Sequence, residues 1–327
     1  MLQSFRRANF SELANLWSNY FPPRYDVDPE LLKLNTVDCP VFDWGASLIH
    51  APDGPALGFV VVKKSAPGRL YPGRVSDDAY LCAIAYQDSQ TAVDLLAEVK
   101  AILRNRGVRN LRFGQDAWHF FPGVPTDFSA LKNLLEVEGF TEGTEAHDME
   151  RDLADYENKH PVPDGYSVRP LSIDDIDAVK EFMLEEFPGR WPYDLEEKVR
   201  REGYPHCVMG LFRGEQIVGF ARIQKWDDKV AMAGGVWKKD LGDHWGSLGP
   251  IGVSAGLRGK GLGHALLAAS LEHLKNLGVK RCLIDWTVLE KFYGEHGFKV
   301  ARTYKSMNLD LESLPAAKTT RRDIGLG

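Results

Sequence analysis

The sequence predicts an α/β protein with two tandem domains, each built on a mixed, mostly antiparallel, twisted sheet that is flanked by helices. Three observations support this prediction. The chain has 327 residues, which is more than one ordinary hydrophobic core accommodates. Stretches with helical apolar periodicity alternate with short β-rich runs that are bounded by turn residues. The same series of these features occurs twice along the chain, which indicates an internal duplication.

A capped helix that ends in the same short motif opens each half. Asn9–Glu12 has the form of a capping box, and Ser172–Asp175 repeats it with Asp in place of Glu. The helices that follow are expected to end at residues 21–25 and 187–191. Both of these segments have the pattern Phe-Pro-x-Arg-aromatic.

The elements that come next also recur in order. A turn signal precedes a β-rich run in each half, at Asp53-Gly54 and at Arg213-Gly214. Each half then has a long helix that ends at a glycine, a strand, and a Gly-Phe pair that leads into a last strand. The paired segments are 58–62 and 219–223, 91–106 and 263–277, 107–113 and 278–284, and 134–140 and 292–298.

This duplication sets the expected domain boundaries. We place one domain at residues 1–154 and a second at 165–312. The segment 155–164 between them is polar and contains prolines, which is typical of a linker. The tail 313–327 has no clear periodicity, so it is expected either to be disordered or to pack on a neighbouring element.

Composition excludes several classes of protein. Hydrophobic residues make up 44% and charged residues 26%, as in soluble globular proteins. The net charge of −6 argues against sequence-independent nucleic-acid binding. The four cysteines form no CxxC pair, so neither a metal site nor a disulfide framework is predicted. No apolar run reaches the roughly 18 residues of a membrane span, and residues 1–7 lead into no signal peptide. We therefore expect a cytoplasmic protein with no nucleic-acid or membrane partner.

A glycine-rich loop in the second half has the features of an anion site. Residues 248–253 are predicted as a strand, 254–264 as the loop, and the apolar periodicity after it as a helix. Glycines let backbone N–H groups turn inward, and the helix N-terminus adds a positive dipole end. Arg258 and Lys260 add positive charge.

The spacing of the glycines distinguishes this loop from two better-known phosphate motifs. A dinucleotide fingerprint needs its third glycine one position later than Gly263, and a P-loop needs Ser or Thr where Gly261 follows Lys260. The pattern that fits is Arg-x-x-Gly-x-Gly, at Arg258, Gly261 and Gly263.

The strand, this loop, the following helix and Phe292-Tyr293-x-x-x-Gly297-Phe298 together resemble the GCN5-related N-acetyltransferase (GNAT) superfamily, over essentially all of residues 165–312. The resemblance implies two tandem GNAT-like domains and an acyl-CoA-dependent N-acyltransferase. It implies transfer of an acetyl group from acetyl-CoA, as co-substrate, to a primary amine of a small molecule such as an amino sugar, an amino acid or a polyamine.

The resemblance also implies a cofactor site and a general acid. In that family the loop wraps the pyrophosphate of acetyl-CoA, and the pantetheine arm lies along the preceding strand. Tyr293 matches the tyrosine that many relatives use to protonate the CoA sulfur, and a phenol with a pKa near 10 is protonated at neutral pH. The alternative for Tyr293 is core packing with Phe292 and Phe298. The implied cofactor residues are Ile251, Gly252, Val253, Arg258, Gly259, Lys260, Gly261, Leu262, Gly263 and His264.

The general base is less defined, because the strand before the loop carries no carboxylate. His244, which titrates near neutral pH, and Asp285, at the end of the following strand, are the candidates. Structural roles for both residues, or a chain of water molecules, are the alternatives.

The acceptor amine is expected near Arg190 and Trp191, because the family admits it beside the loop after the first helix of the domain. A guanidinium could hold a carboxylate or phosphate, and an indole could stack on a sugar. The alternative is a packed loop, since Arg24 and Tyr25 repeat the pair in the first half.

The first half lacks the cofactor motif. Its strand 79–86 leads through residues 87–90 straight into a helix, and Asp88 would repel a phosphate there. We therefore expect a degenerate GNAT-like domain that does not bind CoA and instead stabilises the second domain or shapes its acceptor pocket.

Three other functions are compatible with the resemblance. The first is acetylation of a cysteinyl amine on an amino-sugar conjugate, as in mycothiol synthases. The second is a non-catalytic acyl-CoA sensor. The third is a peptidoglycan-bridge aminoacyl transferase, against which the acidic charge balance and the intact loop argue.

Overall fold

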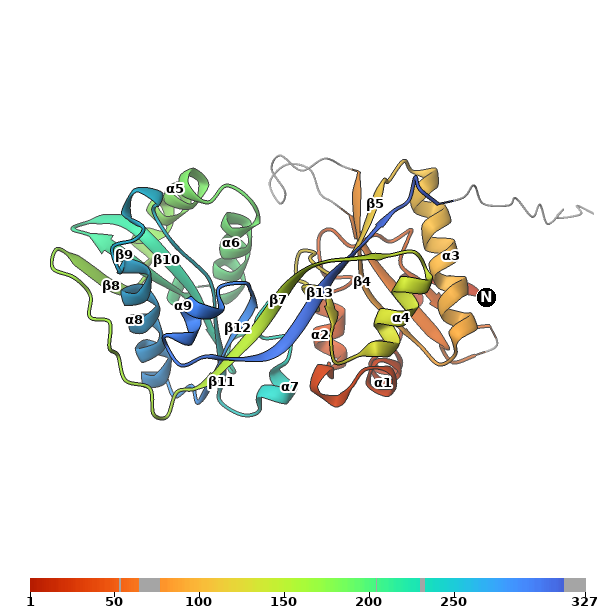
Figure 1. Cartoon of the computed structure of the whole chain (residues 1–327), viewed down its shortest axis with the longest axis horizontal. Helices are drawn as coiled ribbons and strands as arrows, with labels where there is room; N and C mark the ends of the chain where they lie inside the picture. Colours follow the sequence, from red (N-terminus) through yellow and green to blue (C-terminus); the bar gives the residue numbers. More distant parts are fainter. Residues whose placement is uncertain (53, 65–76, 204, 230–232, 315–327) are drawn as a thin grey trace, which may run out of the picture.

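The computed structural model of the chain describes residues 1–52, 54–64, 77–203, 205–229 and 233–314 (Figure 1). Its strands join into one 13-stranded, mostly antiparallel sheet that runs through both halves of the molecule. The strands of the first half are β1 Leu2–Ser4, β2 Leu48–His50, β3 Gly58–Lys64, β4 Asp78–Tyr86, β5 Asn110–Phe113, β6 Val124–Pro125 and β7 Thr141–Asp152. Those of the second half are β8 Tyr166–Pro170, β9 Val208–Arg213, β10 Gln216–Lys225, β11 Trp245–Val253, β12 Arg281–Thr287 and β13 Lys299–Asp310.

Helices cover this sheet in both halves (Figure 1). The first half has α1 Phe10–Tyr20, α2 Pro29–Leu34, α3 Ser89–Asn105 and α4 Ser129–Val137. The second half has α5 Ile176–Glu186, α6 Arg190–Glu202, α7 Lys238–Leu241, α8 Leu262–Asn276 and α9 Glu290–Gly294. In the described ranges, no helix is both long enough and apolar enough to cross a membrane.

The duplicated elements form where the sequence predicts them. Asn9 caps α1 by accepting hydrogen bonds from the backbone N–H groups of Ser11 and Glu12. The capping box is complete only in the second half, where the Ser172 N–H donates to Asp175 at 2.7 Å. In the first half the Glu12 carboxylate instead accepts from the Ala56 N–H, so it ties α1 to the turn before β3. Asp53 of the predicted turn and the tail from residue 315 lie outside the described residues.

One segment differs from its prediction. The sequence predicts a loop around Arg190 and Trp191, but α6 begins at Arg190. Gly189, at a φ of 151°, precedes the first turn and lets the chain reverse after α5. Arg190 and Trp191 therefore have helical geometry at the start of α6, and their orientation is fixed by the helix.

The two halves exchange their last strands. Along the sheet the central order is β5-β13-β7-β12, so β13 pairs with β5 of the first half and β7 pairs with β12 of the second. Between them, β7 and β13 pair antiparallel from Lys299 opposite Glu150 to Asn308 opposite Thr141. Tyr304, Met307 and Leu309 of β13 accordingly lie in the core of the first half. The predicted domain boundaries stay a prediction, but this exchange joins the halves into one sheet.

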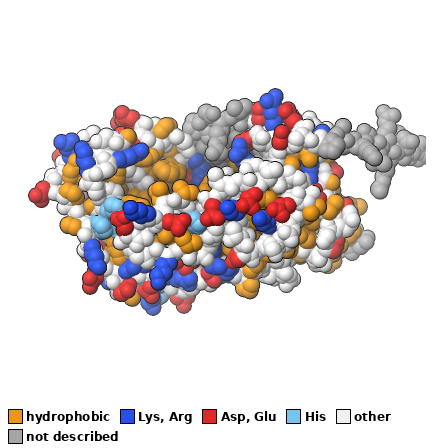
Figure 2. All heavy atoms as spheres, viewed as in Figure 1, with side chains coloured by type: hydrophobic (Ala, Val, Ile, Leu, Met, Phe, Trp, Pro, Cys, Tyr) orange, Lys and Arg blue, Asp and Glu red, His pale blue; other side chains and the backbone are white. Residues whose placement is uncertain are grey.

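Charged side chains mark both faces of this strand pair. On the surface, Figure 2 shows a band of acidic and basic side chains across the middle of the molecule, where β7 and β13 run in Figure 1. Lys305 lies 3.4 Å from Glu142 and 3.2 Å from Glu145 in two such ion pairs. Exposed pairs of this kind stabilise a fold by roughly 1 kcal/mol or less, so the buried face carries more of the constraint.

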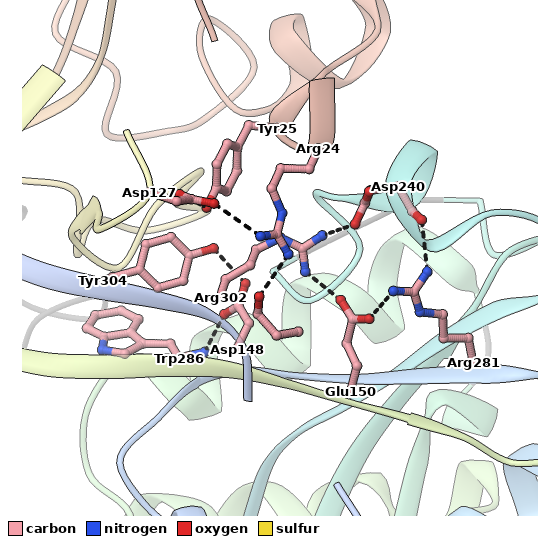
Figure 3. A network of polar contacts seen from close by, with 11 residues as sticks. Arg24, Tyr25, Asp127, Asp148, Glu150, Asp240, Arg281, Trp286, Arg302 and Tyr304 are labelled. Atoms are coloured by element: carbon pink, nitrogen blue, oxygen red, sulfur yellow. Dashed lines mark hydrogen bonds and ion pairs between the residues drawn. The ribbon is translucent and has the colours of Figure 1, made fainter. Parts of the chain in front are cut away.

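On the buried face, Arg302 of β13 forms the centre of a polar network (Figure 3). Its fully buried guanidinium contacts Glu150 of β7 and Asp240 of α7. Beside it the Tyr304 hydroxyl donates to Asp148 of β7 at 2.7 Å, and the Trp286 N–H of β12 donates to the same carboxylate at 3.1 Å. The network therefore connects α7 with three neighbouring strands of the sheet, β13, β7 and β12.

Asp148 gives this network a pH dependence that can be measured. Burial raises the pKa of Asp148 from 3.8 to about 6, although the Arg302 charge and the Tyr304 hydrogen bond oppose the rise. Because the folded state holds this proton more tightly than the unfolded chain, the stabilisation from Asp148 is full below about pH 4 and is lost as the pH rises through about 6.

We expect the free energy of unfolding of the wild type to fall relative to Asp148→Asn, by up to about 3 kcal/mol, as the pH rises over this interval. The asparagine stands in for the neutral acid at every pH. Chemical denaturation of both proteins between about pH 4 and pH 7 measures the difference. A difference that does not change with pH would contradict the prediction.

Candidate active site

A pocket lies where β11 and β12 diverge. The parallel ladder between them runs from Trp245 opposite Arg281 to Ser247 opposite Leu283, whereas β11 stays paired with β10 as far as Val253. The pocket has a volume of about 660 Å³. Its lining comes from Gly249–Ile251 of β11, Ile284–Leu289 in and after β12, Phe187–Trp191 and Asp194, Arg222 of β10, Ala233, Tyr293 of α9, and Gln115 and His119 of the first half.

This divergence leaves a backbone edge for a ligand. In the part of the chain that the structure describes, the edge of residues 249–253 that faces away from β10 has no strand partner. Its N–H and C=O groups can therefore bond an extended chain that lies along β11. Ile251, Gly252 and Val253, predicted for the pantetheine arm, lie on this segment. Gly252 is needed for packing, because a Cβ there would lie 2.5 Å from the Phe187 ring.

The glycine loop follows directly at the end of β11. Arg258 donates through Nε to the Val253 carbonyl at 3.1 Å, which holds the loop against the strand end. Gly259 and Gly261 both have a φ of 77°, a left-handed conformation that favours glycine. Gly261 is the N-cap of α8, and a Cβ added there would meet no atom within 4 Å. The exposed N–H groups at this helix start form a site that can bind an anion such as a pyrophosphate.

The side chain of His264 contacts the segment after α9. Its Nδ1 lies 3.0 Å from Nε2 of His296, and its Nε2 lies 3.5 Å from the Glu295 carboxylate. The imidazole on the first turn of α8 is thus engaged with the segment after α9. Of the predicted cofactor residues, Arg258–Gly263 form the loop and the helix start, and His264 contacts their neighbours.

In the first half, the N-terminus of α3 is the position equivalent to the start of α8, and a carboxylate of the chain occupies it. Asp88 is the N-cap of α3 and accepts the Thr91 N–H at 2.9 Å and the Thr91 hydroxyl at 2.9 Å. These two hydrogen bonds lower the pKa of Asp88, so it is ionised at neutral pH. A fixed negative charge at this helix N-terminus opposes binding of a second anion there.

Tyr293 borders the pocket from α9 and is 5% exposed. Its ring packs on Phe292 and Phe298, at centroid distances of 4.9 and 6.0 Å. Burial, with smaller contributions from Asp285 and Cys282, raises the pKa of the phenol above its ordinary value. The hydroxyl is therefore fully protonated at neutral pH and suited to donate a proton. The packing and the proposed acid role are compatible in one residue.

The two candidate bases lie in different places. Asp285 lines the pocket from β12, at a bulge where the pairing with β7 shifts between Ile284 and Thr287. His244 lies at the opposite end of β11, beyond the pocket lining, and packs on Trp226 with a centroid distance of 4.5 Å. The structure thus brings Asp285 together with Tyr293 and leaves His244 outside.

Arg190 and Trp191 both reach the pocket and are both engaged with protein groups. Arg190 lies 2.9 Å from the Asp194 carboxylate and donates through Nη1 to the Asp116 carbonyl of the first half at 2.8 Å. Its guanidinium also lies 5.5 Å from the centre of the Trp286 ring. Trp191 packs against Phe187 and Phe220. Their part in acceptor recognition stays a prediction.

The sequence interpretation missed His119. Its imidazole Nε2 lies 3.4 Å from Oδ2 of Asp285, although the two residues belong to different halves of the chain. The only local signal is a histidine within the aromatic run Trp118-His119-Phe120-Phe121. An aromatic run of this kind is ordinarily core, and nothing in it indicates contact with the second half.

Comparisons with known proteins agree with this geometry. Residues 176–298 match the model of the acetyltransferase (GNAT) family. A mycothiol acetyltransferase from Streptomyces scabiei is 28% identical over 165 residues, which cover 48% of this chain and 49% of the relative. The chain thus spans about half the length of the curated relative that it matches.

Solved structures share the whole two-half fold. The GCN5-related glucosamine N-acetyltransferase region of a fungal multi-domain β-N-acetylglucosaminidase has a TM-score of 0.79 and 18% identity, and the match covers 94% of this chain and 38% of that one. A GCN5-related N-acetyltransferase from Sphaerobacter thermophilus has a TM-score of 0.67 and 17% identity, with 95% of both chains covered. A tandem GNAT protein from the clavulanic acid biosynthesis pathway has a TM-score of 0.65 and 14% identity, covering 97% of this chain and 100% of that one.

The solved structures show that the chain has the two-half fold of GCN5-related N-acetyltransferases. Residues 176–298 match the acetyltransferase (GNAT) family model, and the chain as a whole has the fold of a tandem GNAT protein. The predicted fold class, a mixed and mostly antiparallel sheet in two GNAT-like halves, is confirmed.

The contrast between Gly261 and Asp88 predicts a single acetyl-CoA site. Gly261→Asp and Gly263→Asp place a negative charge at the start of α8, so we expect calorimetric binding of acetyl-CoA to be lost in both. The wild type should show one site per chain. Gly107→Asp is the matched control, because Gly107 has a φ of 74°, open space around it and no part in the loop. Two equal sites, or unchanged binding in the Gly261 and Gly263 variants, would contradict the assignment.

Proposed function

We propose that this chain transfers an acetyl group from acetyl-CoA to a primary amine of a small molecule by direct attack. One observation carries the proposal: the unpaired edge of β11 runs from the pocket to an open helix N-terminus at Gly261. An extended pantetheine arm along that edge would put its pyrophosphate at the loop and its thioester in the pocket beside Asp285 and Tyr293.

The residues around the pocket meet the needs of the reaction. The acceptor ammonium must lose a proton before its nitrogen can attack the thioester carbon. Backbone N–H groups of residues 249–253 that face the pocket can polarise the carbonyl oxygen. As the C–N bond forms and the C–S bond breaks, the thiolate takes the proton of the Tyr293 hydroxyl. The products are the N-acetylated amine and CoA.

Amino sugars are the acceptor class that we propose to test first. The glucosamine N-acetyltransferase region has this fold, and its name specifies an amino sugar as substrate. The pocket offers the Trp286 ring together with the polar groups of Gln115 and Asp285, a combination that suits a hydroxylated ring with an amine. The similarity to a mycothiol acetyltransferase supports a second candidate, a cysteinyl amine on an amino-sugar conjugate.

Tyr293→Phe tests the proton donor, because the change keeps the ring and removes the hydroxyl. We expect kcat to fall by roughly 10²- to 10⁴-fold while the Kd for acetyl-CoA is nearly unchanged. CoA release with an identified acceptor measures the first quantity and calorimetry the second. Tyr166→Phe on β8 is the control and should behave as the wild type. Wild-type kcat in Tyr293→Phe would reduce this tyrosine to a packing residue.

Arg190→Ala tests acceptor recognition, with Arg24→Ala as its matched control. Both arginines belong to the repeated motif, and each donates to a carbonyl of the other half at 2.8 Å, Arg190 to Asp116 and Arg24 to Ala301. Only Arg190 lines the pocket. We expect Arg190→Ala to raise KM for the acceptor by roughly 10- to 100-fold and to leave KM for acetyl-CoA unchanged. Equal effects of the two substitutions on KM and on the melting temperature would show that Arg190 only packs.

A further inference from the structure

The first half contributes a loop to the pocket of the second half. Residues 114–121, which follow β5, bring Gln115 and His119 into the pocket lining. The side chain of His119 is 4% exposed and that of Asp285 is 15% exposed, with 3.4 Å between Nε2 and Oδ2. The His119 ring also meets the Trp286 ring edge-on, at a centroid distance of 4.9 Å. An ionisable pair of this kind inside a reaction pocket calls for a chemical role.

A buried lysine, Lys63, holds the loop that carries His119. Lys63 of β3 is fully buried and contacts the Asp116 carboxylate. Its ammonium also donates to the carbonyls of Ala117 at 2.9 Å and Trp118 at 3.0 Å. Burial lowers the pKa of Lys63, but the charge of Asp116 outweighs it and the pKa is raised, so the lysine stays charged. Two of these bonds hold backbone carbonyls directly before His119, and the third holds the Asp116 side chain.

The backbone on both sides of the pair is strained. Four non-glycine residues in the described ranges have a positive φ, and three of them flank this contact: Gln115 at 63°, Trp118 at 53° and Trp286 at 44°. Such conformations are costly for side chains of this size and persist only where the surroundings enforce them. Lys63 enforces the loop, and Asp148 enforces Trp286 by accepting its N–H at 3.1 Å. Strain maintained at one contact indicates that its geometry matters for function.

We propose that His119 is the general base of the reaction and that Asp285 stabilises the charge that His119 acquires. This assignment rests on the proposed function. In the neutral ring Nε2 carries the proton and faces the ionised Asp285, which leaves the lone pair on Nδ1, a buried atom with no hydrogen-bond partner among the described residues. Nδ1 of His119 takes one proton from the acceptor ammonium, and the freed nitrogen lone pair attacks the thioester carbon. The thiolate is protonated by Tyr293, so the proton gained by His119 is released to solvent and Tyr293 is reprotonated before the next turnover. The half without a cofactor loop thereby supplies a catalytic residue to the half that has one.

The charges around the pair fit this division of roles. Burial raises the pKa of Asp285, but His119, Arg222 and Arg190 outweigh it and hold that pKa below its usual range. An ionised Asp285 is a weak proton acceptor and a good partner for an imidazolium. The ionisable groups that face the pair are Arg222 of β10, Arg190 of α6, Tyr293 of α9 and Asp148 of β7.

The test compares His119→Gln, Asp285→Asn and His244→Gln in the full chain, with an acceptor identified by a CoA-release screen of amino sugars and other amines. For the wild type we expect kcat/KM for the acceptor to rise with pH and then level off. In His119→Gln it should fall by roughly 10²- to 10⁴-fold and lose that dependence, and added imidazole should restore part of the activity of His119→Ala. Asp285→Asn should lower kcat, and His244→Gln should match the wild type.

Calorimetry with acetyl-CoA separates the possible failures. If the wild type acetylates an amine and His119→Gln keeps the wild-type pH profile, the base assignment is overturned and the proposed function stands. If the wild type binds acetyl-CoA but acetylates no amine in the screen, the proposed function is overturned and the base assignment with it. If His119→Gln does not fold, Asp285→Asn becomes the test. An unchanged rate and pH profile in Asp285→Asn would then overturn the assignment of His119 and Asp285 as base and partner.

Discussion

The antiparallel pairing of β7 with β13 is the constraint on which the pocket depends. Each of these strands has its other neighbour in the opposite half, so the two sheets become one only when this pair forms. Arg302 makes the register specific, because its buried guanidinium is compensated by Glu150 and Asp240 and would be strongly destabilising without them. Since β5 and β12 are held on either side of the pair, the loop after β5 comes to lie against the end of β12. The contact between His119 and Asp285 is a consequence of that arrangement.

The duplication gives the two halves one design with different chemistry at corresponding points. The helix start in the second half is left open by Gly261, whereas the helix start in the first half is occupied by the Asp88 carboxylate. The repeated arginines illustrate the same divergence, since Arg24 joins a structural network and Arg190 borders the pocket. Asp88 occupies the N-terminus of α3 with a fixed negative charge. The loop after β5 of that half contributes Gln115 and His119 to the pocket lining.

Most buried carboxylates around the pocket have a positively charged partner. Asp285 is compensated by the surrounding arginines and His119, Asp116 by Lys63, and Glu150 by Arg302. Asp148 is the exception, because burial leaves its pKa raised to about 6 while it holds the strained Trp286 backbone. The strand network and the pocket are therefore joined by one carboxylate, which accepts from Tyr304 and from the backbone N–H of Trp286.

The sequence alone determined the features that depend on neighbours along the chain. Apolar periodicity and capping placed α1, α5 and α8, and the spacing of Arg258, Gly261 and Gly263 defined the loop, because backbone conformation and helix starts are set within a few residues. Only the tertiary structure decided the strand exchange, the helical start at Arg190 and the approach of His119 to Asp285. Strand partners and side-chain contacts between distant segments follow from packing of the whole sheet. A local pattern such as Trp118–Phe121 is equally compatible with a buried core, so it cannot specify which residue lies across from it.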